Sequence, residues 1–224
     1  MPGRRRRSRR LAVVSPFLAL WLATLGASSA SASTAYTRDV YFLGAYEHQV
    51  DSRTCTAASV AMMENMIAKR DLNLSQMAIL RYEQPRDALN DSVQRGSDPL
   101  GWSRAATYFS RYTPHPTTYR WEAYSTESSA LRRAAVQIAT TGKPVGLVVL
   151  HGKHAIVMTG LIATADPRRD PFTLTYVYVS DPLGHTHYRY AAALSPLDKY
   201  LELDATATYD AAWYGKYVII VPQA

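Results

Sequence analysis

The sequence predicts an α+β domain, because helical patterns fill its first half and strand patterns fill its second half. Runs of helical composition cover residues 56–69, 74–82, 102–112 and 128–140. After Pro144 the chain changes to short apolar or alternating runs that are bounded by turn residues. Helices and strands segregated in this way are typical of α+β domains. We therefore expect a helical lobe packed on an antiparallel β-sheet lobe.

The expected helices have recognisable beginnings and ends. Residues 56–69 are rich in Ala and Met and contain no Gly or Pro, which favours a helix. Ser75 is a residue type that caps helix N-termini, and it stands at the start of the second helix. The fourth helix is entered through the polar residues 125–127 and is ended by Gly142 and Pro144.

The expected strands form one antiparallel sheet. Residues 145–150 and 154–162 are apolar runs, and the His151-Gly152-Lys153 segment between them predicts a hairpin turn. Further strands are expected at 172–180, 185–190 and 217–221, and a short helix at 196–203 is expected to pack across the sheet.

The first 35 residues have the layout of a secretory signal peptide. Residues 1–10 carry six arginines and no acid, residues 11–27 are mostly apolar, and small residues follow. Cleavage after Ala32 and cleavage after Ala35 fit equally well. The Arg9-Arg10 pair matches a twin-arginine signal poorly, so we expect the general export route. The alternative is an uncleaved N-terminal anchor.

The positive charge of the chain belongs mostly to this leading segment. The sequence has 25 basic and 18 acidic residues, a net charge of +7, and six of the basic residues precede residue 11. The remaining basic residues nearly balance the acids, so we expect no nucleic-acid partner. Residues 36–224 suit a single secreted, extracellular domain. We expect a monomer that has no contact with a membrane after the signal is cleaved.

Cys55 is the single cysteine of the chain, and an exported protein cannot use one cysteine for an internal disulfide. It stands at the start of the first expected helix, just after the polar residues 51–54. The partial positive charge of a helix N-terminus stabilises a thiolate, which is the nucleophilic form of cysteine. Cys55 is therefore either a nucleophile or a small buried hydrophobic residue on a helix rich in Ala and Met.

A cysteine nucleophile needs a base, and His154 is the best placed histidine. It opens an apolar strand, so the sheet fixes its position and its ring can face a cleft. The other histidines are weaker candidates. His185 and His187 alternate on one strand as a metal pair would, but no further ligands cluster with them, and we expect no metal and no cofactor.

Two further residues complete the chemistry. Asp181 directly follows the expected strand at 172–180, where its carboxylate can accept the Nδ1 hydrogen of His154. The alternative is that the Asp181-Pro182 pair simply begins a turn, as many Asp-Pro pairs do. Gln49 precedes Cys55 by six residues, and its side-chain amide can join the Cys55 backbone N–H in an oxyanion hole.

These residues, in this order, resemble the papain-like cysteine peptidases of the bacteriocin-processing, double-glycine-leader type (family thirty-nine of the cysteine peptidases) and their stand-alone relatives. The resemblance covers roughly residues 41–184, and it rests on the order and spacing of several motifs. The matching segments are residues 49–63 (QVDSRTCTAASVAMM), 142–145 (GKPV), 153–160 (KHAIVMTG) and 179–182 (VSDP).

The resemblance implies two lobes with a cleft between them, Cys55 as the nucleophile and His154 as the base. It implies that Asp181 orients the histidine and that Gln49 helps to form the oxyanion hole. This sequence departs from the family at Thr56, where the family usually has Gly. Residues 36–224 also lack the membrane transporter and ATPase to which the leader-processing members are fused, so the double-glycine substrate does not carry over.

The expected function is that of a secreted cysteine peptidase that hydrolyses a peptide or protein substrate through a covalent acyl-enzyme. Two alternatives remain open. The same triad can transfer the acyl group to an amine or deamidate a side chain, as in transglutaminase-like enzymes, or the scaffold can serve as a non-catalytic secreted binding module.

Overall fold

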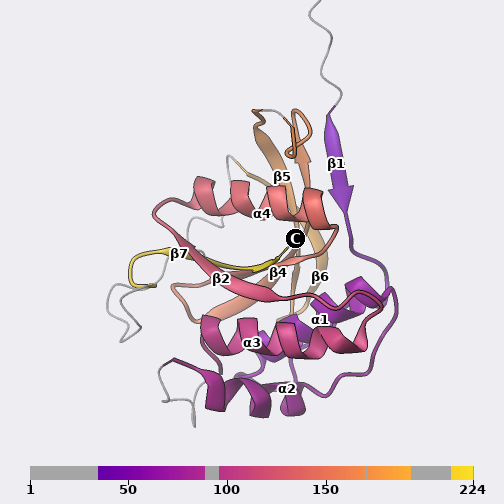
Figure 1. Ribbon diagram of the computed structural model, residues 1–224, viewed down its shortest axis with the longest axis vertical. Helices are drawn as coiled ribbons and strands as arrows, with labels where there is room; N and C mark the ends of the chain where they lie inside the picture. The colour runs from indigo at the N-terminus through magenta and orange to yellow at the C-terminus, as the bar shows by residue number, and fades with distance from the viewer. Residues whose placement is uncertain (1–34, 89–95, 170, 193–212, 224) are drawn as a thin grey trace, which may run out of the picture. The chain divides into compact units, whose positions relative to one another are not determined.

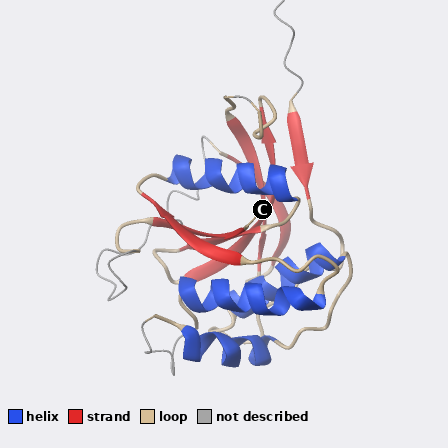
Figure 2. Ribbon diagram, in the orientation of Figure 1, coloured by secondary structure: helices blue, strands red, loops and turns tan. Residues whose placement is uncertain are grey.

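The computed structural model describes residues 35–88, 96–169, 171–192 and 213–223. These residues form helices and a single antiparallel sheet (Figure 2). The elements in chain order are β1 (Tyr36–Asp39), α1 (Cys55–Ala68), α2 (Gln76–Glu83), η1 (Gln84–Arg86), α3 (Pro99–Phe109), η3 (Ser110–Tyr112), β2 (Tyr119–Tyr124), α4 (Glu127–Thr141), β3 (Val145–Val149), β4 (His154–Ala163), β5 (Leu174–Asp181), β6 (His185–Ala191) and β7 (Tyr217–Pro222). The predicted α+β class, with a cysteine-bearing helix packed on an antiparallel sheet, is confirmed. The expected signal peptide and the helix expected at 196–203 lie outside the described residues.

The sheet has the order β2-β7-β3-β4-β5-β6, and β4 is its most connected strand. One edge of β4 pairs with β3 over residues 154–158 and then with β1 over residues 160–163, while its other edge pairs with β5. The β3–β4 turn has positive φ angles at Leu150, His151 and Gly152. This turn confirms the predicted hairpin and places His154 at the first position of β4, opposite Val149.

Helices cover both faces of the sheet, which the sequence did not indicate. Helices α1, α2 and α3 lie on one face and α4 lies on the other (Figure 1). The alternation of β7 shows the division, because Val218 and Ile220 face the core of α1 and α3 whereas Ile219 and Val221 face the core of α4. One detail of the prediction therefore changes. The four helices do not form a single lobe, because α4 packs on the opposite face of the sheet from α1, α2 and α3.

Two strands were not predicted from the sequence. β1 pairs with β4, and β2 pairs with β7 at the sheet edge. β2 falls in the stretch that was assigned helical character, yet it has the alternation of a strand. Tyr119, Trp121 and Ala123 face the core of α1, while Tyr124 packs against the core of α4.

The helix ends follow the capping residues named from the sequence. The Ser75 side chain accepts a hydrogen bond from the Ala78 backbone N–H, and the Thr126 side chain accepts one from Ser129. Gly142 ends α4 in the left-handed conformation, at φ 69°. The third helix begins earlier than expected, because Asp98 caps it and Pro99 occupies its first turn.

Helix α1 is the buried centre of the larger core. All residues from Cys55 to Met66 are buried, so tertiary packing holds this helix on every side. The Ser59 hydroxyl also donates to the carbonyl oxygen of Ala155 on β4, at 3.4 Å. This packing fixes the start of α1 against the start of β4. Within the described part of the chain, no helix has the length and apolarity needed to cross a membrane.

We predict that Gly146→Ala lowers the free energy of unfolding by about 1–3 kcal/mol, the usual range for an overpacked core. A Cβ on Gly146 of β3 would lie 2.4 Å from Cζ2 of the buried Trp102 on α3. Denaturant unfolding measures the loss. In a Trp102→Leu background the same change should be milder, because the indole ring is gone. An equal loss in both backgrounds would contradict this reading of the α3–β3 contact.

Candidate active site

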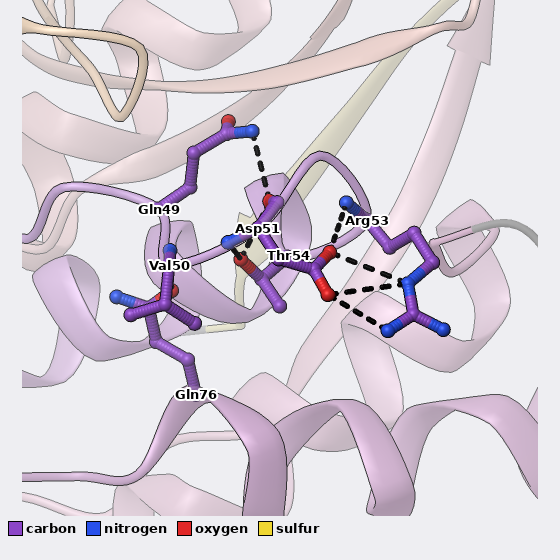
Figure 3. A network of polar contacts seen from close by, with 6 residues as sticks. All are labelled: Gln49, Val50, Asp51, Arg53, Thr54 and Gln76. Atoms are coloured by element: carbon purple, nitrogen blue, oxygen red, sulfur yellow. Dashed lines mark hydrogen bonds and ion pairs between the residues drawn. The ribbon is translucent and has the colours of Figure 1, made fainter.

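The turn at residues 51–54 leads the chain into α1 and is closed by its own hydrogen bonds (Figure 3). The Thr54 hydroxyl accepts from the Asp51 backbone N–H at 3.1 Å and donates to the Asp51 carbonyl oxygen at 3.0 Å. The Asp51 carboxylate accepts from the Arg53 backbone N–H at 2.6 Å and pairs with the Arg53 guanidinium. A short and strongly connected turn therefore presents the first residue of α1.

Cys55 is that first residue, as the sequence predicted. Its backbone N–H is one of the four at a helix N-terminus that have no partner within the helix. The side chain is 9 % exposed, a burial that suits an inert cysteine as well as a shielded nucleophile. The neighbourhood of His154 favours the second alternative, because Cys55 lies close enough to the imidazole to raise its pKa.

His154 and Asp181 meet because β4 and β5 are antiparallel neighbours. His154 begins β4 and Asp181 ends β5, so the register that sets Val157 opposite Ser180 brings the two side chains to the same end of the sheet. His154 Nε2 lies 2.7 Å from Asp181 Oδ1. From the sequence we expected this bond at Nδ1, and the structure places it at Nε2 instead. With Nε2 bonded to Asp181, Nδ1 is the nitrogen left for the Cys55 thiol.

The surroundings of His154 favour its protonated form. Burial lowers the pKa of His154, but the hydrogen bond that His154 donates to Asp181 and its interactions with Cys55 outweigh burial and raise the pKa to about 9. Burial likewise raises the pKa of Asp181, but hydrogen bonds from His154 and the Leu183 backbone leave it below its usual value. At neutral pH the site therefore favours the imidazolium form of His154 beside the Asp181 carboxylate.

Gln49 lies on the same loop as the turn at residues 51–54. Its Nε2 donates to the Asp51 carbonyl oxygen at 3.0 Å (Figure 3), and an amide nitrogen carries a second hydrogen that can serve a substrate oxygen. Its own backbone N–H donates to the Pro182 carbonyl oxygen at 3.0 Å. Gln49 therefore ties the loop before the cysteine to the turn that follows Asp181.

Two supporting residues were missed in the sequence. Gln76, at the start of α2, accepts from the Val50 backbone N–H at 3.0 Å and donates to the His48 carbonyl oxygen at 2.7 Å. The Tyr46 hydroxyl donates to the Asp181 carbonyl oxygen at 3.2 Å. Both hold the loop that carries Gln49. Neither lies in a local motif, because their partners are far away in the chain.

The paired histidines of β6 do not assemble a metal centre. His187 lies 2.8 Å from the Asp39 carboxylate and stacks on Tyr41, with ring centroids 4.2 Å apart. Over the described ranges there is no group of three or more His, Cys, Asp or Glu side chains arranged to hold a metal ion.

Comparison with known proteins gives structural likeness only. No protein-family model and no curated protein matches the chain. Its structure is similar to that of the cysteine protease CMS1MS2 of Carica candamarcensis, solved in complex with E-64, at 12 % identity and a TM-score of 0.41, over 83 % of this chain and 97 % of that one. It is also similar to UfSP from C. elegans, at 13 % identity and a TM-score of 0.43, over 90 % of this chain but 40 % of that one.

Proposed function

We propose that this chain is a papain-like cysteine peptidase in which Cys55, His154 and Asp181 form the catalytic triad. The observation that carries the proposal is the shared imidazole: His154 is hydrogen-bonded to Asp181 at 2.7 Å, and Cys55 at the start of α1 lies close enough to raise the pKa of His154. A nucleophile, a base in contact with it and a third group that orients the base are the parts that covalent catalysis requires.

The geometry supports a two-step reaction. The Cys55 thiolate attacks the carbonyl carbon of a peptide bond, and the His154 imidazolium donates its proton to the leaving amine as the C–N bond breaks. The resulting thioester is then hydrolysed by a water molecule from which neutral His154 takes a proton. The Cys55 backbone N–H and the Gln49 side-chain amide are the donors proposed for the oxyanion.

Secretion is part of the same proposal. It rests on the basic, apolar and small-residue layout of residues 1–35, and the substrate is then an extracellular peptide or protein. Acyl transfer and deamidation would use the same three residues. Measuring released ammonia and new N-termini on one protein substrate separates these reactions from hydrolysis.

We predict that Cys55→Ala and His154→Asn each abolish hydrolysis of labelled casein, because each removes a group that changes covalent or protonation state during the reaction. His151→Asn is the matched control. His151 is exposed in the β3–β4 turn at φ 53°, a conformation that Asn tolerates, and its loss should leave the rate unchanged. Retention of activity by Cys55→Ala would rule out the proposed nucleophile.

We predict that Asp181→Asn shifts the alkaline limb of the kcat/KM profile to lower pH by about 1–2 units, within the range that one neighbouring charge produces. The sign follows from His154, whose pKa of about 9 depends on the Asp181 carboxylate. Without that carboxylate the imidazolium is lost at lower pH. Asp166→Asn, at an aspartate paired with Arg168 instead, should leave the profile in place. Superimposable profiles for wild type and Asp181→Asn would argue against the triad.

We predict that Gln49→Ala lowers kcat by about 100- to 1,000-fold, the usual effect of losing one oxyanion donor. The rate of Cys55 alkylation by iodoacetamide should change little, because alkylation forms no oxyanion. A parallel loss of both rates would mean that Gln49 shapes the site instead of stabilising the transition state.

A further inference from the structure

A buried carboxyl group lies against the first turn of α1. Glu83, the last residue of α2, is 0 % exposed, and its Oε2 accepts a hydrogen bond of 2.9 Å from the Thr56 hydroxyl. Thr56 is itself buried, and the other carboxyl oxygen of Glu83 is buried without a hydrogen-bond partner. A polar pair of this kind is costly to bury unless its geometry is well defined.

The position of Thr56 gives this pair its significance. Thr56 directly follows Cys55, so its side chain belongs to the same helical turn as the thiol. The Thr56–Glu83 bond therefore joins the first turn of the proposed nucleophile helix to the end of α2.

The charged groups that act on Glu83 are acids. They are Asp87, which follows η1, and Asp98, which caps α3, while α1 contributes only the Thr56 hydroxyl. Asp87 Oδ1 accepts from the Ser97 hydroxyl at 2.7 Å and from the Asp98 backbone N–H at 3.2 Å. A Cβ on Gly101 would fall 1.9 Å from Asp87 Oδ1 and 3.0 Å from the Glu83 carbonyl oxygen, so α3 packs closely on both.

We propose that Glu83 is a positioning residue for Cys55, acting through the Thr56 hydroxyl to hold the first turn of α1. Its catalytic meaning rests on the proposed function of Cys55. Burial raises the pKa of Glu83 most, Asp87 and Asp98 raise it further, and the Thr56 hydrogen bond opposes them, giving a value of about 8. Glu83 is therefore neutral at pH 7, and above pH 8 it places a negative charge beside the α1 N-terminus.

That charge opposes the reactive form of the nucleophile. A thiolate at Cys55 and a carboxylate at Glu83 repel each other across a dry helix contact, where charges are poorly screened. Ionisation of Glu83 is then a second alkaline limit on the reactivity of Cys55, beside the loss of the His154 proton. The two limits are separable because different substitutions move them.

The experiment measures second-order alkylation of Cys55 by iodoacetamide from pH 5 to pH 10. Glu83→Gln keeps an acceptor for Thr56 and cannot ionise, so we expect a wild-type rate at pH 6.5 and a rate about three- to tenfold above wild type at pH 8.5. Thr56→Val should lower the rate about five- to tenfold across the range, and Thr56→Ser should restore it.

Glu64→Gln is the matched control. Glu64, which lies on α1 nine residues beyond Cys55, is another fully buried carboxyl group. Burial raises its pKa, as it does that of Glu83. Its substitution should leave the alkylation profile at the wild-type position. A purely structural effect of removing a buried carboxyl group would move both glutamine variants alike.

The outcomes are distinct. Superimposable profiles for wild type and Glu83→Gln would overturn the charge effect on Cys55, and a Thr56→Val variant that folds and alkylates at the wild-type rate would overturn the positioning role. If Thr56→Val does not fold, Thr56→Ala is measured in its place, and a wild-type rate for that variant would overturn the positioning role. The two proposals can also fail separately. If the variants change the alkylation rate of Cys55 as expected but the wild-type protein cleaves no peptide substrate, the peptidase function is refuted and the positioning role stands. A wild-type Cys55 no more reactive than a free thiol would overturn both.

Discussion

The pairing of β4 with β5 is the constraint on which the candidate site depends. An antiparallel pair places the first residue of one strand beside the last residue of the other, and here these residues are His154 and Asp181. β4 is buried along almost its whole length, and Val177 and Val179 of β5 belong to the core that α4 covers. The candidate site thus lies at the end of the best connected part of the sheet, where the strand pairing brings His154 and Asp181 close together.

Helix α1 brings the third member to this edge. It packs against β4, and its first residue reaches the imidazole that the sheet holds. The loop before α1 is fastened at two separate points, to α2 through Gln76 and to the turn after Asp181 through the Gln49 backbone. Cys55, His154 and Gln49 therefore belong to three elements that are joined by direct hydrogen bonds or packing.

The parts of the site that could be predicted from the sequence are those set by local chemistry. A cysteine at a helix start, a histidine at a strand start and an aspartate at a strand end follow from capping and periodicity within a few residues. The Nε2 bond of His154, the contact of Thr56 with Glu83 and the placement of α4 on the opposite face depend on packing between distant segments. β2 shows a third case, because its alternation was present in the sequence but lay between helical stretches.

The position of β1 bears on when the domain can fold. Tyr36 at the beginning of the described chain lies opposite Ala163 of β4, and the chain between them supplies α1 to α4. A strand whose partner lies so far along the chain gains no pairing energy until that partner is present, and closing so long a loop is slow. During synthesis from the N-terminus β1 therefore stays unpaired until β4 has emerged, so this part of the sheet is completed late.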